Sequence, residues 1–148
     1  MSPFRLRQRP PTILLVEDRA PDARLIEEIL QKDRGPTIVR TVANGDQALA
    51  YLRRDGDYIS APRPHLIVLD LGLPGRTGLD VLREIKVHPE YRAIPVVVFT
   101  TSAAPSEIAE VYGHYANAYI VKPIGLDAFT GVLQDIKRFW LDVAQLPE

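Results

Sequence analysis

The chain has 148 residues, of which 46% are hydrophobic and 25% are charged, with a net charge of -1 and no cysteine. This length and composition predict one globular domain without a disulfide framework, thiolate chemistry or a cysteine-based zinc site. The near-neutral charge argues against a DNA or anionic lipid partner. Because the sequence shows no secretory signal and no apolar run of roughly 18 residues, we expect a cytoplasmic protein with no membrane partner.

The first third of the chain predicts an arm, two strands and two helices. Residues 1–11 are rich in arginine and proline, and we expect a frayed N-terminal arm. The apolar run 12–16 is typical of a buried strand, and the apolar stripe over 22–33 predicts a helix. A short strand over 37–42 and a helix over 45–54 follow.

The central stretch is Pro64-His65-Leu66-Ile67-Val68-Leu69-Asp70-Leu71-Gly72-Leu73-Pro74-Gly75, in which an apolar run leads directly into one carboxylate and a Gly/Pro turn. Such a run is typical of a strand buried on both faces of a parallel sheet. The remaining expected elements are a helix from Thr77 to His88, a strand over 94–99, a helix over 105–115, a strand over 117–121 and a helix over 125–143.

Strands and helices therefore alternate five times along the chain. This alternation predicts an α/β fold in which a five-stranded parallel sheet carries helices on both faces.

Polar side chains follow four of the five predicted strands. Glu17 and Asp18 come after the first strand, Asp70 after the central one, Thr100 after the next and Lys122 after the last. Because the carboxyl ends of parallel strands lie at one edge of a sheet, we expect these side chains to gather there.

This set of side chains has the parts that phosphoryl transfer requires. Three neighbouring carboxylates repel one another unless a cation lies among them, and oxygen ligands of this kind suit Mg²⁺. A lysine and a hydroxyl supply donors for a phosphoryl oxygen, and an aspartate can act as the nucleophile.

The sequence resembles the receiver domain of two-component response regulators, the class typified by the chemotaxis protein CheY. The resemblance covers about residues 12–138 and depends on four motifs in order: Ile13-Leu14-Leu15-Val16-Glu17-Asp18, Leu69-Asp70-Leu71-Gly72-Leu73-Pro74-Gly75, Thr100-Thr101-Ser102 and Tyr119-Ile120-Val121-Lys122-Pro123. It implies a doubly wound, flavodoxin-like sheet, and a signalling phosphoacceptor that promotes only its own phosphorylation and dephosphorylation rather than an enzyme acting on other molecules.

The resemblance also implies the role of each residue at the site. Asp70 would accept a phosphoryl group from a sensor histidine kinase. Asp18 and Glu17 would hold Mg²⁺, directly or through water, together with Asp70 and the backbone carbonyl of Gly72.

On the same basis, Lys122 and Thr100 would bind the phosphoryl oxygens. Tyr119 would be the switch aromatic that turns inward as Thr100 moves toward the phosphate, and plain packing of Tyr119 in its strand is the alternative. The bond between Lys122 and Pro123 would be cis.

A narrower resemblance links the chain to single-domain regulators that are paired with phytochrome histidine kinases, which implies a bacteriophytochrome as the kinase. It depends on the long loop 55–64 with Arg63-Pro64-x-Leu and on the Phe139-Trp140-Leu141 tail. Residues 139–148 extend the last helix and are far too few for a DNA-binding domain, so output is expected to depend on binding another protein.

The last predicted helix carries an apolar seam that exceeds what one sheet face easily covers: Leu126, Phe129, Leu133, Ile136, Trp140 and Val143. We interpret Phe139, Trp140 and Leu141, together with Tyr112, as a two-fold homodimer contact. The alternative is that Trp140 packs against its own domain.

Three other functions compete with a phosphorylated receiver. A flavodoxin-like flavin protein should have a Ser/Thr/Gly-rich first loop, but residues 17–22 here are acidic. Phosphatases with an aspartate nucleophile are typified by an Asp-x-Asp motif after the first strand. The corresponding residues here, Asp70-Leu71-Gly72, lack the second carboxylate. The third is a receiver that takes no phosphate and acts only as an interaction module.

Overall fold

The computed structural model describes residues 9–32 and 35–147, so most of the predicted N-terminal arm lies outside the described residues. Five strands form one sheet in which every pair is parallel. The strands are β1 (Thr12–Val16), β2 (Ile38–Val42), β3 (Leu66–Leu69), β4 (Val96–Thr100) and β5 (Ala118–Val121).

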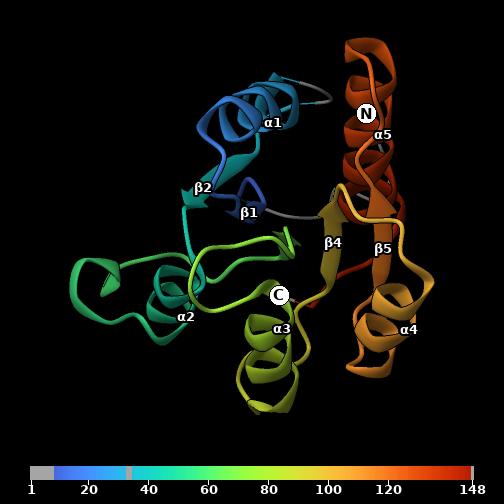
Figure 1. Ribbon diagram of the computed structural model, residues 1–148. Helices are drawn as coiled ribbons and strands as arrows, with labels where there is room; N and C mark the ends of the chain where they lie inside the picture. The colour runs from blue at the N-terminus through green and yellow to red at the C-terminus, as the bar shows by residue number, and fades with distance from the viewer. Residues whose placement is uncertain (1–8, 33–34, 148) are drawn as a thin grey trace.

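The sheet has the order β2-β1-β3-β4-β5, which places β3 at its centre. Figure 1 shows β2 and β1 to one side of β4 and β5. Val16 at the end of β1 pairs with Leu69 at the end of β3, so the residues that follow these two strands leave the sheet side by side. The predicted doubly wound sheet is thus confirmed, and its reversal of strand order lies beside β3, where α/β folds of this kind bind their ligands.

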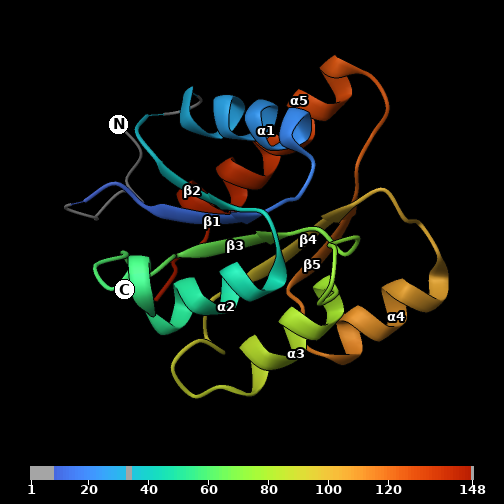
Figure 2. The same ribbon diagram turned by 60° about the vertical axis from the view of Figure 1, so that its left-hand side comes forward.

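Helices cover both faces of the sheet. In Figure 2, α1 and α5 lie on one side of it, and α2, α3 and α4 lie on the other. The five helices are α1 (Ala20–Lys32), α2 (Gly45–Arg53), α3 (Gly78–Val87), α4 (Pro105–Gly113) and α5 (Leu126–Lys137), with a short 3₁₀ helix η1 (Gly56–Tyr58) inside the long loop after α2.

Alternate side chains of the inner strands enter two separate cores, which explains why these strands are apolar throughout. From β3, Ile67 and Leu69 pack toward α2 and α3, whereas Leu66 and Val68 pack toward α1 and α5. All four are fully or almost fully buried, so β3 is held rigidly from both faces.

Local capping fixes the helices that follow β2 and β3. Asn44 accepts a hydrogen bond from the Gln47 N–H at the start of α2. At the start of α3, Thr77 and Asp80 form a capping box. The first residue of α3, Gly78, lies so close to the end of β3 that an added Cβ would be 2.3 Å from the carbonyl oxygen of Asp70.

The end of the chain differs from the single long helix that was predicted over 125–143. After α5 the backbone forms a π-helical turn, η2 (Arg138–Val143), in which the Ala144 N–H donates to the Phe139 carbonyl at 2.7 Å. Just before this turn, the buried ammonium of Lys137 donates to the carbonyls of Leu30 (2.6 Å) and Gly35 (3.1 Å). Lys137 thereby joins α5 to the C-terminal end of α1.

Two further observations concern the predictions from sequence. No peptide bond among the described residues is cis, so the implied cis bond before Pro123 is not found. Within residues 9–32 and 35–147, none of the helices combines the length and the apolar character needed to cross a membrane.

Candidate functional site

Asp70 stands immediately after β3, at the carboxyl edge of the sheet. Its N–H donates to the Val16 carbonyl at 3.1 Å, which continues the pairing of β3 with β1 by one residue. Its Oδ1 accepts a hydrogen bond from the Gly72 N–H at 3.2 Å, so the turn after the strand fixes the carboxylate. Asp70 is 8% exposed. The strand thus presents one oriented carboxylate at the edge of a rigid sheet.

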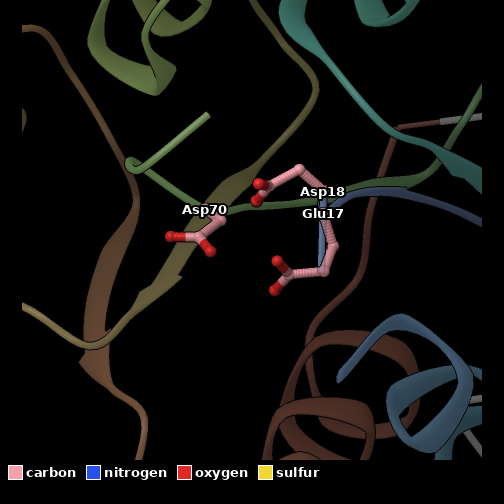
Figure 3. A group of neighbouring side chains, drawn as sticks. All are labelled: Glu17, Asp18 and Asp70. Carbon is pink, nitrogen blue, oxygen red and sulfur yellow. The ribbon is translucent and has the colours of Figure 1, made fainter. Parts of the chain in front are cut away.

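Glu17 and Asp18 leave the end of β1 beside Asp70. Each of these three residues offers one oxygen atom, and the three atoms lie within 4.8 Å of one another. Figure 3 shows the three carboxyl groups close together beyond the ends of β1 and β3. Glu17 is buried, whereas Asp18 is exposed. A set of hard oxygen donors, one of them open to solvent, fits a divalent cation of the Mg²⁺ type.

Lys122, which follows β5, brings a positive charge to these carboxylates. Its Nζ donates to Glu17 Oε1 at 2.6 Å and to Asp70 Oδ2 at 3.2 Å. A third bond runs to Asp22 Oδ2 at 3.0 Å. Asp22 was not among the predicted site residues. The sequence signal for Asp22 is its place in the acidic segment 17–22 that follows the first strand.

Burial, neighbouring charges and hydrogen bonds shift the pKa values of Glu17 and Asp70 in opposite directions. Burial raises the pKa of Glu17 to about 7, with a further rise from the charge of Asp70 and a partly offsetting hydrogen bond from Lys122. Burial also opposes ionisation of Asp70, but the charge of Lys122 and a hydrogen bond from Thr100 outweigh it and lower the pKa of Asp70. Asp70 is therefore ionised at neutral pH, as a nucleophile must be.

Lys122 keeps its proton in this environment. Burial favours the neutral amine, but the hydrogen bonds to Glu17 and Asp22 outweigh burial and raise the pKa of Lys122. The site consequently contains a fixed cation at neutral pH, directly beside the acceptor carboxylate.

Thr100 and Tyr119 occupy the neighbouring strand ends. Thr100 is the buried last residue of β4, and its side chain donates a hydrogen bond to the Asp70 carboxylate. The Tyr119 hydroxyl donates to the carbonyl of Ser102 at 2.8 Å, just past the end of β4. The Tyr119 N–H donates to the Tyr112 hydroxyl at 3.0 Å, which joins β5 to α4. The switch role of Tyr119 and the Gly72 carbonyl as a metal ligand stay predictions.

The four predicted dimer residues divide into two groups. Tyr112 and Phe139 are 48% and 49% exposed. Leu141 is only 3% exposed and belongs to the core beneath α1 and α5, and Trp140 packs against that same core with its ring edge-on to Phe139. Leu141 has no free surface for a partner, because the π turn directs it into its own domain.

The comparison with known protein families matches residues 13–134 to the response regulator receiver domain. The chain belongs to this family. Among known relatives, the response regulator Rcp1 of Synechocystis sp. is 40% identical over 138 residues, which cover 93% of this chain and 94% of Rcp1.

Two solved receiver structures share the fold closely. The phosphorylated cyanobacterial phytochrome response regulator RcpA matches with a TM-score of 0.91 and 44% identity, over 95% of this chain and all of that one. The Mn²⁺-bound form of Rcp1 matches with a TM-score of 0.89 and 40% identity, over 94% of this chain and all of that one. The receiver fold and the response regulator family predicted from the motifs are therefore confirmed.

Proposed function

We propose that this receiver domain takes a phosphoryl group on Asp70 from the phosphohistidine of a sensor histidine kinase. The observation that carries this proposal is the convergence of Glu17, Asp18 and Asp70 on one small region, with Lys122 bound to the acceptor. In this step a carboxylate oxygen of Asp70 attacks the phosphorus atom. A new O–P bond forms, the P–N bond to the histidine breaks, and the imidazole nitrogen keeps the electron pair and takes up a proton.

Each side chain of the site has a part in the proposed step. The hydrogen bond from Gly72 to Oδ1 and the one from Lys122 to Oδ2 hold the Asp70 carboxylate in one orientation. Lys122 and Thr100 donate to the phosphoryl oxygens as the negatively charged phosphoryl group is transferred to Asp70. This positioning is the main contribution that the protein makes, because phosphoryl transfer depends mostly on orientation and charge.

Glu17, Asp18 and Asp70 are the residues that would hold Mg²⁺, with the Gly72 carbonyl as a further ligand. When bound, the cation neutralises the carboxylates and the incoming phosphoryl oxygens. The Mn²⁺-bound structure of Rcp1 supports a divalent cation in a close relative. We infer that the protein is a signalling phosphoacceptor in the cytoplasm and not an enzyme that acts on other molecules.

We further propose a phytochrome-class histidine kinase as the donor. RcpA is described as a phytochrome response regulator, and its chain aligns with 95% of this one at 44% identity. Two other solved relatives, at 36% identity, are bacteriophytochrome response regulators. The test is phosphotransfer from a purified, autophosphorylated phytochrome kinase compared with an unrelated histidine kinase, and equal transfer from both would contradict the assignment.

The proposed output is binding to another protein, with a homodimer as the first candidate. The half-exposed rings of Tyr112 and Phe139 are the predicted contact residues that the structure leaves accessible. Val143, also half-exposed, lies in the same π-helical turn as Phe139.

Acceptance of the phosphoryl group is tested by labelling with radioactive acetyl phosphate in the presence and absence of Mg²⁺. We expect label on the unmodified protein only with Mg²⁺, and none on Asp70→Asn. Asp127→Asn is the matched control, because Asp127 is an exposed acid in the first turn of α5. Label that persists on Asp70→Asn would refute the assignment.

A further inference from the structure

Asp22 lies outside the residues proposed to accept or bind the phosphoryl group or to hold the cation, yet it contacts one of them, Lys122, directly. It stands in the first turn of α1, and its Oδ2 accepts a hydrogen bond from Lys122 Nζ at 3.0 Å. Its side chain is 23% exposed, so the contact is shielded in part from solvent. An ion pair in such a place is stronger than one on the open surface.

The contacts of Lys122 use all the donors that it has. An ammonium group carries three N–H bonds, and Lys122 Nζ has three carboxylate partners. Glu17 (2.6 Å) follows β1 directly, and Asp22 (3.0 Å) lies in the first turn of the next element, α1. The contact with Asp70 is the longest of the three, at 3.2 Å. Lys122 cannot donate to a phosphoryl oxygen without giving up one of these bonds.

We propose that Asp22 is a positioning residue, which holds Lys122 on the β1–α1 side of the site in the unphosphorylated protein and competes with the incoming phosphoryl group for its ammonium. This inference depends on the proposed phosphorylation of Asp70. Asp22 stabilises the starting state more than the transition state, in which Lys122 must turn toward the phosphoryl oxygens, so it slows phosphorylation.

A simpler role for Asp22 predicts a different result. An acidic residue in the first turn of a helix stabilises that helix through its dipole, whatever else it contacts. Asp127 likewise lies in the first turn of its helix, α5, where it is exposed. A purely structural role would therefore give Asp22 and Asp127 the same small effect on helix stability and no effect on the rate of phosphorylation.

The experiment measures the phosphorylation rate with acetyl phosphate at saturating Mg²⁺ on gels that retard phosphoproteins. In this reaction Asp70 forms the O–P bond, and acetate leaves with the electron pair of the broken P–O bond. We expect Asp22→Asn to react about 3–10-fold faster, the factor that corresponds to one partly shielded ion pair. Asp22→Glu should return toward the original rate, and Asp127→Asn should not change it.

A double-mutant cycle separates an effect through Lys122 from direct repulsion of the phosphodonor by the Asp22 charge. In a Lys122→Gln background, Asp22→Asn should no longer accelerate the reaction. An equal acceleration in both backgrounds, or an unchanged or slower rate in the single variant, would overturn the proposal.

Two controls keep the result interpretable. Should Asp22→Asn unfold in the assay, Asp22→Ala removes the same charge and has the highest intrinsic helix propensity. If the unmodified protein takes no label on Asp70, the proposed function itself fails. If it takes label but the Asp22 variants react at its rate, only the role of Asp22 is lost.

Discussion

Replacing Gly78 by alanine tests how the start of α3 fixes the position of Asp70. The added Cβ would lie 2.3 Å from the Asp70 carbonyl oxygen and 2.6 Å from Leu71 Cα. Both neighbours are backbone atoms, so neither can rotate away, and the turn after β3 must shift. Overpacking of this kind costs about 1–3 kcal/mol of unfolding free energy. The intrinsic gain from replacing a helical glycine offsets at most about 1 kcal/mol of this cost.

Gly131→Ala is the matched control, because Gly131 also lies within a helix but has nothing within 4 Å of an added Cβ. That variant should be more stable by about 0.5–1 kcal/mol. Urea unfolding of the two variants should therefore give midpoints that differ by about 1 M, since m is about 1–3 kcal/mol per molar urea for domains of this kind. Gly78→Ala should also accept phosphate more slowly, because its acceptor has moved.

Equal stability of the two variants would refute this reasoning. So would a Gly78→Ala protein that is destabilised but accepts phosphate at the original rate, because that result would separate the turn from the position of Asp70.

Three further predictions concern the metal site, the buried lysine and the exposed aromatic ring. Glu17→Gln should weaken Mg²⁺ binding by about 10-fold or more, because it removes one charged ligand; calorimetric titration that gives an unchanged affinity would exclude Glu17 as a ligand. Lys137→Met should lower the unfolding free energy by about 2–4 kcal/mol, because it leaves the carbonyls of Leu30 and Gly35 without their buried donor. If urea unfolding gives the variant and the unmodified protein free energies that agree within about 0.5 kcal/mol, as expected for a surface substitution, this prediction is contradicted. Light scattering at tens of micromolar should give the mass of a dimer, and Phe139→Ser should reduce it toward a monomer; a monomeric mass for the unmodified protein would count against the homodimer.

The placement of the acceptor and its acidic neighbours could be predicted from the sequence because it follows from topology. An apolar run that ends in Asp70 indicates a buried strand, and a parallel sheet brings the ends of such strands to one edge. The structure places Glu17 and Asp18 there for this reason, at the end of a strand that pairs directly with β3.

Features that depend on the exact path of the backbone were not accessible in this way. The helix after β1 begins at Ala20, two residues earlier than predicted, so Asp22 is its third residue rather than its first, and its carboxylate contacts Lys122. The π-helical turn after α5 contains one more residue than an α-helical turn. A period of 3.6 residues therefore does not predict that the side chain of Leu141 points into the core. The close approach of Gly78 to the backbone of Asp70, which leaves no room for a Cβ, likewise cannot be predicted from the spacing of apolar residues.

The proposed signalling function depends on one covalent bond, between phosphorus and the carboxylate that follows β3. Borohydride reduction of the phosphorylated protein converts an aspartyl phosphate to homoserine, and peptide mass mapping then locates the modified residue. We expect homoserine at position 70 alone, and only when Mg²⁺ was present during phosphorylation. Homoserine at position 18, or an unmodified position 70 in protein that carries the phosphate label, would contradict the assignment of Asp70 as the acceptor.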